Sequence, residues 1–235
     1  MCSACLAKPA PITADYYCIA CKTPFVNPFP LDEQGLCGLC RRGLTGFDAA
    51  YTFGSYEDEL RQLIHLFKYV GIQTLAKPLG KLMLTALPRD RSFDVIVPMP
   101  LHWMKRWRRG FNQSELLARQ VSRRWNVPVK HMVRRTRNTG AQAGLSNAKR
   151  RENVSRAFRA NGAVKGKRVL LVDDVMTTGA TAGACARALK RAGAVHVTLL
   201  TLARVDRRLT PVARGAMPIP ESFRSFENAQ PGSIA

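Results

Sequence analysis

Several features that would place a chain in a common class are missing from this 235-residue sequence. No apolar run is long enough to cross a bilayer, and the first residues lack a basic region followed by an apolar one. The phosphate-loop pattern G-x-x-x-x-G-K-[ST] and the dinucleotide pattern G-x-G-x-x-G are also absent, which excludes two common glycine-rich phosphate sites. We therefore expect a cytoplasmic protein, a setting in which paired cysteines more often hold metal than form disulfides.

Acidic residues are scarce as well: 16 stand against 37 Lys and Arg, and the formal net charge is +21. Most of the excess lies between Leu101 and Arg168, where 19 basic residues, two glutamates and the tryptophans Trp103, Trp107 and Trp125 occur. Such a stretch is typical of a protein with a polyanionic partner, nucleic acid first and phosphorylated metabolites second. A solvated basic surface without a partner is the alternative. The residues that we expect to contact nucleic acid are Lys105, Arg106, Trp107, Arg108 and Arg109.

Six of the seven cysteines lie within the first 45 residues, as three C-x-x-C pairs separated by Pro-rich loops. Two of these pairs, fifteen residues apart, have the spacing of a four-cysteine zinc ribbon, so the predicted Zn²⁺ ligands are Cys18, Cys21, Cys37 and Cys40. Bound zinc would supply folding energy to a segment with little hydrophobic content. A redox or disulfide role is the alternative. The remaining pair, Cys2 and Cys5, is either idle or part of a site that needs sequence ahead of Met1.

The most informative stretch reads V-L-L-V-D-D-V-M-T-T-G-A-T, from Val169 to Thr181. Its four apolar residues predict a strand buried on both faces, which ends in Asp173 and Asp174 and leads through a Thr- and Gly-rich turn into a helix. Backbone N–H groups and the helix dipole at such a turn attract phosphate, while adjacent carboxylates suit ribose hydroxyls or a divalent ion. These residues indicate a sugar-phosphate site, with an ordinary strand-to-helix turn as the alternative.

This stretch resembles the phosphoribosyl-pyrophosphate (PRPP) loop of type I phosphoribosyltransferases. The resemblance implies that PRPP or a related ribose phosphate binds here together with Mg²⁺. It also implies that Asp173 and Asp174 contact the ribose hydroxyls. The residues that would surround the 5′-phosphate are Val175, Met176, Thr177, Thr178, Gly179, Ala180 and Thr181.

The remaining apolar patterns predict an α/β fold: a mainly parallel sheet with helices on both faces. Ser55 and Asp58 indicate a helix start, and Asn112 with Glu115 indicates another. His65, near the end of the first of these helices, fits a surface position better than a catalytic one. Strands are expected at residues 49–54, 94–98, 169–172 and 195–202, and a further helix at about 74–87.

Several blocks occur in a fixed order behind the cysteine ribbon: P-M-P-L-H, R-R-G-F-N-Q, Q-A-G-L-S, K-R-R-E-N-V and the acidic loop. In this order they resemble the ComF/GntX family, competence protein F-like proteins with a phosphoribosyltransferase fold, over residues 18–204. The resemblance implies a pyrophosphate-side loop formed by Met99, Pro100, Leu101 and His102. It further implies a flexible lid at about residues 138–151, for which a plain surface loop is the alternative. The lid residues are Arg137, Gln142, Ser146, Lys149 and Arg150.

The predicted organisation is a zinc ribbon at residues 1–46, a phosphoribosyltransferase-like domain at 47–207 and a weakly ordered tail at 208–235. One hypothesis is a PRPP-dependent, Mg²⁺-assisted phosphoribosyltransferase with an unknown acceptor. The family resemblance also implies a role in natural transformation, with cytoplasmic single-stranded DNA and helicase-type proteins as partners. The alternative is a non-catalytic, zinc-containing nucleic-acid-binding protein that uses the fold as a ligand sensor.

Overall fold

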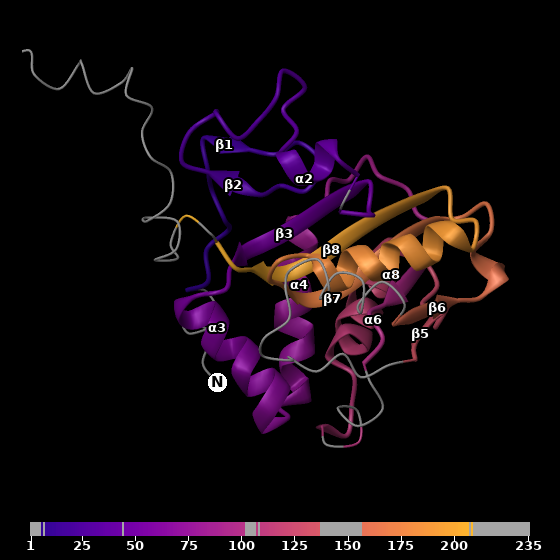
Figure 1. Ribbon diagram of the computed structural model, residues 1–235. Helices are drawn as coiled ribbons and strands as arrows, with labels where there is room; N and C mark the ends of the chain where they lie inside the picture. The colour runs from indigo at the N-terminus through magenta and orange to yellow at the C-terminus, as the bar shows by residue number, and fades with distance from the viewer. Residues whose placement is uncertain are drawn as a thin grey trace, which may run out of the picture.

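The computed structural model describes residues 6, 8–43, 45–101, 107, 109–136, 157–206 and 208. At its centre lies a four-stranded parallel sheet in the order β3, β8, β7, β4 (Figure 1). The two inner strands are the longest and carry almost unbroken apolar runs, as expected for strands buried on both faces. The parallel sheet predicted from the sequence is thus confirmed. Its strands are β3 (Ala49–Ser55), β4 (Val95–Pro98), β7 (Arg168–Met176) and β8 (His196–Arg204).

Helices cover both faces of this sheet (Figure 1). Successive side chains of a strand point to opposite faces, so β7 gives Val169 and Leu171 to one core and Leu170 and Val172 to the other. The first core is closed by α8 (Ala180–Arg191) and includes Val164 of the short turn η3 (Gly162–Val164). The second is closed by α3 (Asp58–His65), η1 (Leu66–Val70), η2 (Gln73–Leu75), α4 (Ala76–Thr85) and α6 (Gln113–Trp125).

Strand β7 is longer than its sequence pattern suggests. It does not end at the acid pair but continues through Val175 and Met176, which pair with Ala203 and Arg204 of β8. The partner strand is nine residues long, so it can supply backbone hydrogen bonds beyond the apolar run. The loop between strand and helix is therefore only Thr177 to Gly179.

The two predicted helix starts have different outcomes. The side chain of Asn112 accepts a hydrogen bond from the Ser114 N–H at 3.1 Å, so this N-cap of α6 is confirmed. Ser55 is the last residue of β3 rather than a cap, because the strand runs further than expected along β8. Helix α3 instead begins after Glu57, which makes no side-chain capping bond.

A small antiparallel hairpin lies beside α8. It is formed by β5 (Val133–Arg135) and β6 (Phe158–Ala160), with Arg134 directly opposite Arg159. The hairpin flanks the segment predicted to be a lid, which itself lies outside the described residues. Phe158 and Val133 anchor it in the same core as α8.

The cysteine-rich segment packs on the edge of the sheet. It contains β1 (Tyr16–Tyr17), β2 (Pro24–Phe25) and α2 (Gly38–Arg41), and Figure 1 shows it beside β3. The Ala50 N–H of β3 donates to the carbonyl of Ala20 at 2.8 Å, and the Ile12 N–H donates to Phe53 at 2.7 Å. These bonds cover the exposed edge of β3. Three of the cysteines belong to the same buried cluster as α8, so the segment shares the core of the α/β fold.

A polar contact also joins two neighbouring strands that are distant in the sequence. The hydroxyls of Thr52 and Thr201 meet at 2.7 Å between β3 and β8, although 149 residues separate them in the chain.

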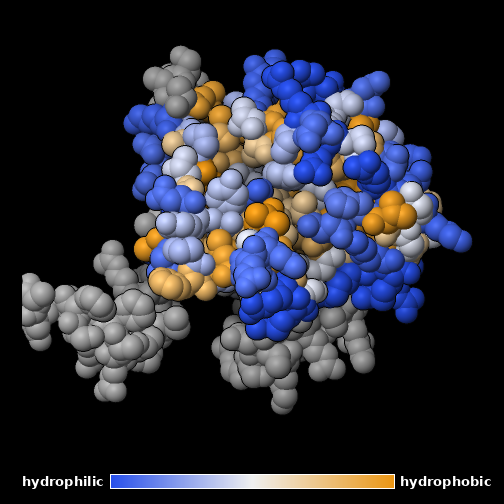
Figure 2. Space-filling view, turned by 90° about the horizontal axis from the view of Figure 1, so that it is seen from above, coloured by the Kyte–Doolittle hydropathy of each residue, from blue (hydrophilic) through white to orange (hydrophobic). Residues whose placement is uncertain are grey.

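The face seen from above in Figure 2 is mainly hydrophilic, with hydrophobic residues in small separate patches. Among the helices that the structure describes, none has the length and apolar character needed to span a membrane.

Candidate functional site

The acid pair lies near the carboxyl end of β7, and each carboxylate has a protein partner. Asp173 Oδ1 accepts from the Ser114 hydroxyl and from the Asp174 N–H, both at 2.9 Å. Asp174 Oδ1 lies 2.9 Å from Lys68 Nζ, and these two side chains are 12% and 13% exposed. Within the described part of the chain, the hydrogen bonds of Asp173 and the closest contact of Lys68 with Asp174 use the Oδ1 atoms.

Burial changes the acid–base behaviour of Asp173. Burial raises the pKa of Asp173 to about 7, and the negative charge of the neighbouring Asp174 carboxylate acts in the same direction. The positive charge of Lys68 acts in the opposite direction. The same interior raises the pKa of the Cys185 thiol, mainly through burial and also through Asp173. Cys185 is therefore an inert core residue, whereas Asp173 changes charge near neutral pH.

The loop after β7 presents several unused backbone donors. Gly179 has φ +77°, in the left-handed region that glycine adopts at little cost, and it immediately precedes α8. Within the ranges described above, the N–H groups of Thr177, Thr178, Gly179 and Thr181 donate to no protein acceptor, while the Ala180 N–H reaches the Thr178 hydroxyl at 3.3 Å. Thr177 and Thr178 are exposed. Open donors at the positive end of a helix are suited to a phosphate group.

Lys68 reaches the acid pair from an unusual backbone segment. The chain forms a π-helical turn at Leu66–Val70, which ends at Gly71 in the left-handed conformation. Such turns are rare and occur often at functional sites. Phe67 of this turn is fully buried against Phe111, which fixes the turn beside the start of α6.

The N-terminal part of α6 connects the acid pair to β4. Asn112 Nδ2 donates to the carbonyl of Met99 at 3.1 Å, and the Met99 N–H donates to Val172 at 2.8 Å. Gln113 is fully buried, and its Oε1 accepts from Arg109 at 3.1 Å while its Nε2 has no hydrogen-bond partner. Asn112 of the R-R-G-F-N-Q block therefore supports both Ser114 and Met99.

The predicted pyrophosphate-side loop is only partly described. Met99 is buried, and its N–H and carbonyl groups are bonded to Val172 and Asn112, so it continues the line of β4. Pro100 and Leu101 follow it and are partly exposed. His102 lies outside the described residues. All five predicted lid residues do too: Arg137, Gln142, Ser146, Lys149 and Arg150.

The structure describes only some of the residues that were predicted to contact nucleic acid. Trp107 is 83% exposed, and Arg109 lies over the ring of Tyr69 with its guanidinium carbon 5.0 Å from the ring centre. Trp125 is instead partly buried and packs against Phe93, with ring centroids 5.6 Å apart, so less of its ring is open to a base than that of Trp107. Lys105, Arg106 and Arg108 lie outside the described residues, as does Trp103.

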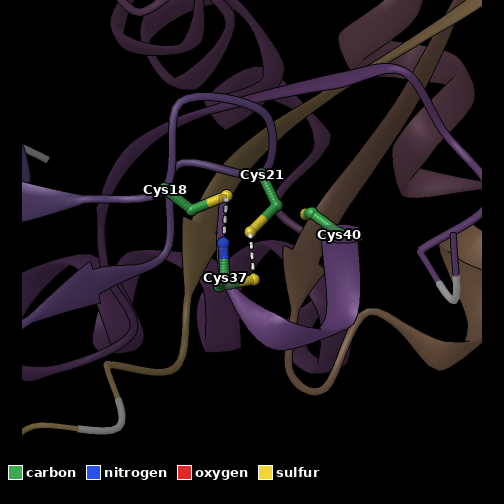
Figure 3. A group of neighbouring side chains, drawn as sticks. All are labelled: Cys18, Cys21, Cys37 and Cys40. Atoms are coloured by element: carbon green, nitrogen blue, oxygen red, sulfur yellow. Dashed lines mark hydrogen bonds between the residues drawn. The ribbon is translucent and has the colours of Figure 1, made fainter. Parts of the chain in front are cut away.

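The four predicted cysteine ligands come together (Figure 3). Their sulfurs all lie within 4.8 Å of one another, and Figure 3 shows the side chains directed toward a common centre. The Sγ atoms of Cys21 and Cys37 are 3.7 Å apart. A tetrahedral site with Zn–S bonds of about 2.3 Å would separate its sulfurs by about 3.8 Å, so the cluster fits such an ion. The cluster could therefore hold a metal ion.

Arg204 joins this cluster to the central sheet. From the end of β8, its guanidinium donates to the Cys21 carbonyl at 2.9 Å and to the Thr23 hydroxyl at 2.7 Å. The Thr23 hydroxyl in turn lies 2.9 Å from Cys21 Sγ. Neither Arg204 nor the acid-pair partners Lys68 and Ser114 stand out in the sequence, because their roles depend on contacts between distant segments.

The comparisons with known proteins agree with this architecture. A family model described as a phosphoribosyl transferase domain matches residues 111–221. The chain is 34% identical over 179 residues to Competence protein F of Haemophilus influenzae, covering 72% of this chain and 78% of that protein. It is 36% identical over 178 residues to DNA utilization protein YhgH of Escherichia coli, covering 72% and 77%.

A solved structure titled as the allosteric regulatory enzyme of purine biosynthesis matches 55% of this chain and 25% of its own, at 24% identity and a TM-score of 0.40. The cysteine cluster, the parallel sheet and the identity across most of both sequences lead to one assignment: the chain belongs to the competence protein F family (ComF/YhgH), with a phosphoribosyltransferase-type fold.

Proposed function

We propose that this protein binds PRPP with Mg²⁺ at the carboxyl edge of its sheet, and that it acts on single-stranded DNA during DNA uptake. The observation that carries the first part is that, within the described residues, four loop N–H groups donate to no protein acceptor and follow an acid pair at the carboxyl end of the same strand. The N–H groups suit the 5′-phosphate, and the carboxylate oxygens suit the ribose hydroxyls. A bare phosphate would not require the acids.

Lys68 explains how two adjacent carboxylates can persist in a buried position. Its ammonium group lies 2.9 Å from Asp174 and offsets one negative charge without a metal. Asp173 and Asp174 could also help to hold Mg²⁺, whose preferred ligands are oxygens. When bound, the ion offsets the negative charge that develops on the departing pyrophosphate. This protein's own residues hold the ribose and orient its reactive carbon.

The tetrahedral fit of the cysteine cluster leads us to propose a structural Zn²⁺ at Cys18, Cys21, Cys37 and Cys40. Four protein thiolates would leave no coordination position open for a substrate, which is the arrangement of structural rather than catalytic zinc sites. The bond from the Cys37 N–H to Cys18 Sγ at 3.3 Å would help to orient a thiolate ligand. The ion would fix the ribbon against β3.

The DNA part of the proposal is supported by the names of the relatives and by the charge of the chain. Competence protein F and DNA utilization protein YhgH are named for processes that involve DNA. A net charge of +21 favours a polyanionic partner, and the exposed Trp107 offers a ring on which a base can stack. Helicase-type proteins would supply or consume the strand.

The test is a double substitution, Asp173→Asn with Asp174→Asn, assayed by calorimetry for Mg-PRPP and by fluorescence anisotropy for an oligo-dT strand. Because amides cannot offset Lys68 or accept hydroxyls as strongly, we expect PRPP affinity to fall by at least tenfold while DNA affinity changes little. Asp90→Asn, which changes an exposed acid far along the chain, is the matched control. Unchanged PRPP affinity in the double variant would refute the site.

Turnover is tested separately. Release of pyrophosphate from Mg-PRPP in the presence of DNA and candidate acceptors would support a transferase. Tight PRPP binding without any pyrophosphate release would instead support the sensor hypothesis, in which the bound nucleotide precursor controls a DNA-handling protein.

A further inference from the structure

A cluster of basic side chains lies away from the acid pair. A hollow of about 690 Å³ is lined by residues of the β5–β6 hairpin and of the C-terminal half of α8. Its basic lining residues come from three elements: Arg134 from β5, Arg159 from β6 and Arg191 from the last turn of α8. All three are exposed. We call this surface the arginine hollow.

The pairing of Arg134 with Arg159 is unfavourable without an anion. The two residues are directly opposite each other in the antiparallel register of the hairpin. Like charges in this arrangement destabilise a pair of strands, typically by a few tenths of a kcal/mol up to about 1 kcal/mol. Among the residues that the structure describes, no carboxylate lies within 4 Å of Arg134, Arg159 or Arg191. An anionic ligand would remove this repulsion.

The uncharged residues that line the arginine hollow are mostly small. Its floor includes Ala160, Ala188 and Ala192, whose small side chains allow a close approach. The aromatic residue in its lining, Phe158, is 3% exposed and therefore offers little ring surface to a base. Recognition here would rest on phosphates and would be independent of base sequence.

The arginine hollow is also separate from the proposed PRPP site. Helix α8 has 12 residues, and the loop at its start and Arg191 at its end are therefore about 18 Å apart. One small phosphate ester cannot occupy both places. The positive charge of three guanidinium groups without acidic neighbours exceeds the negative charge of a single phosphate monoester. A polymer, in contrast, can bring one phosphate to each guanidinium group.

We propose that the arginine hollow binds the sugar-phosphate backbone of single-stranded DNA. The inference rests on the DNA part of the proposed function and gives it a location on the molecule. A single strand is flexible enough to enter the hollow between hairpin and helix, and its evenly spaced phosphates can contact guanidinium groups on three elements. The same α8 helix would then carry a ribose phosphate at its start and a strand of DNA near its end.

The experiment uses the full chain and a fluorescein-labelled 30-nucleotide oligo-dT, with anisotropy measured over a series of salt concentrations. The test variant is Arg134→Gln, Arg159→Gln and Arg191→Gln together. Losing three phosphate contacts should lower the slope of log affinity against log salt by about 2, since each contact to single-stranded DNA contributes about 0.7. At low salt we expect the affinity to fall at least tenfold.

A charge-matched control removes three other exposed cations, on the helices of the opposite face: Arg61→Gln, Lys77→Gln and Lys81→Gln. This control should keep the wild-type slope. Equal losses in the two triple variants would overturn the proposal, because net charge alone would then account for binding. Competition by polyglutamate as strong as that by unlabelled oligo-dT would overturn it too, as would tighter binding of a duplex of equal length.

The two proposals can fail independently. The arginine variant should keep Mg-PRPP affinity within about twofold, and the Asp173 and Asp174 double variant should keep the oligo-dT slope. If wild-type protein does not bind oligo-dT, the proposal for the arginine hollow is overturned while the PRPP site stands. Restoring the charge with Lys at the three positions should restore most of the slope, which a merely structural role of the arginines would not produce.

Discussion

The cysteine ribbon and the acid-pair edge bring polar side chains together in different ways. The ribbon consists of two-residue strands and a four-residue helix, so its backbone alone has little to hold four sulfurs within 4.8 Å. The acid pair lies on a nine-residue strand between two cores, and its partners come from helices packed against that strand. The first geometry should depend on a metal ion, and the second should depend on apolar burial.

The largest effect is expected from Cys37→Ser. Loss of one thiolate should reduce bound zinc from about one ion per chain to nearly none, because structural zinc sites contribute about 10 to 16 kcal/mol of apparent binding energy. Elemental analysis would measure the zinc, and hydrogen exchange should show the ribbon amides losing protection before those of β7. The control is Cys185→Ala, which changes a buried cysteine of α8 outside the cluster, and this variant should bind as much zinc as the wild-type protein. A folded ribbon without metal would contradict this contrast.

A smaller loss is expected from Leu171→Ala on the inner strand. Leu171 is fully buried, so the cavity should lower the free energy of unfolding by about 2 to 5 kcal/mol, as measured by urea denaturation. Zinc content should not change in the folded fraction. Leu171→Met, which conserves volume, should cost less than about 1.5 kcal/mol. Zinc loss in parallel with unfolding would show that the two regions are not separable.

Arg204→Met tests the connection between the two regions. The substitution removes the donors to Cys21 and Thr23 from a buried position, and we expect a loss of about 1 to 3 kcal/mol in unfolding free energy. Zinc should also pass faster to a chelator, because the backbone turn that carries Cys21 loses its hydrogen bonds to Arg204. Chelator-dye kinetics measures this rate. An unchanged rate would mean that Arg204 stabilises the sheet alone.

The last contrast is a pH dependence at the acid pair. With its pKa raised to about 7, Asp173 stays protonated in the folded state over a range in which the unfolded chain is already ionised. Its stabilising contribution is therefore present below about pH 4 and decreases as pH rises to about 7. Mg-PRPP affinity should change in the opposite direction, since the ionised carboxylate accepts hydroxyl groups better. Asp173→Asn should abolish this part of both profiles.

The sequence predicts local features of this protein better than contacts between distant segments. The four-cysteine cluster follows from spacing, because two cysteines with two residues between them can turn toward one metal ion almost independently of their surroundings. The parallel strands follow from their apolar runs. The predicted end of β7 is wrong by several residues, because Val175 and Met176 belong to the strand only where β8 continues beside them.

The environment of the acid pair could not be read from the chain. Lys68 is one of 37 basic residues, and its contact with Asp174 depends on the π-helical turn and on the packing of Phe67. The opposition of Arg134 and Arg159 likewise needs the hairpin register, which no short motif encodes. The roles of the lid segment and of His102 stay predictions, as does the division into ribbon, domain and tail.

The position of β3 next to β8 has a consequence for biosynthesis. The hydroxyls of Thr52 and Thr201 that meet between these strands are 149 residues apart, so β3 leaves the ribosome long before its neighbour exists. At about 5 to 20 residues per second the delay is roughly 7 to 30 s. During that interval the N-terminal segment, with its bonds to Ala50 and Phe53, is the available cover for one side of β3. Early metal capture would thus protect the nascent chain from aggregation.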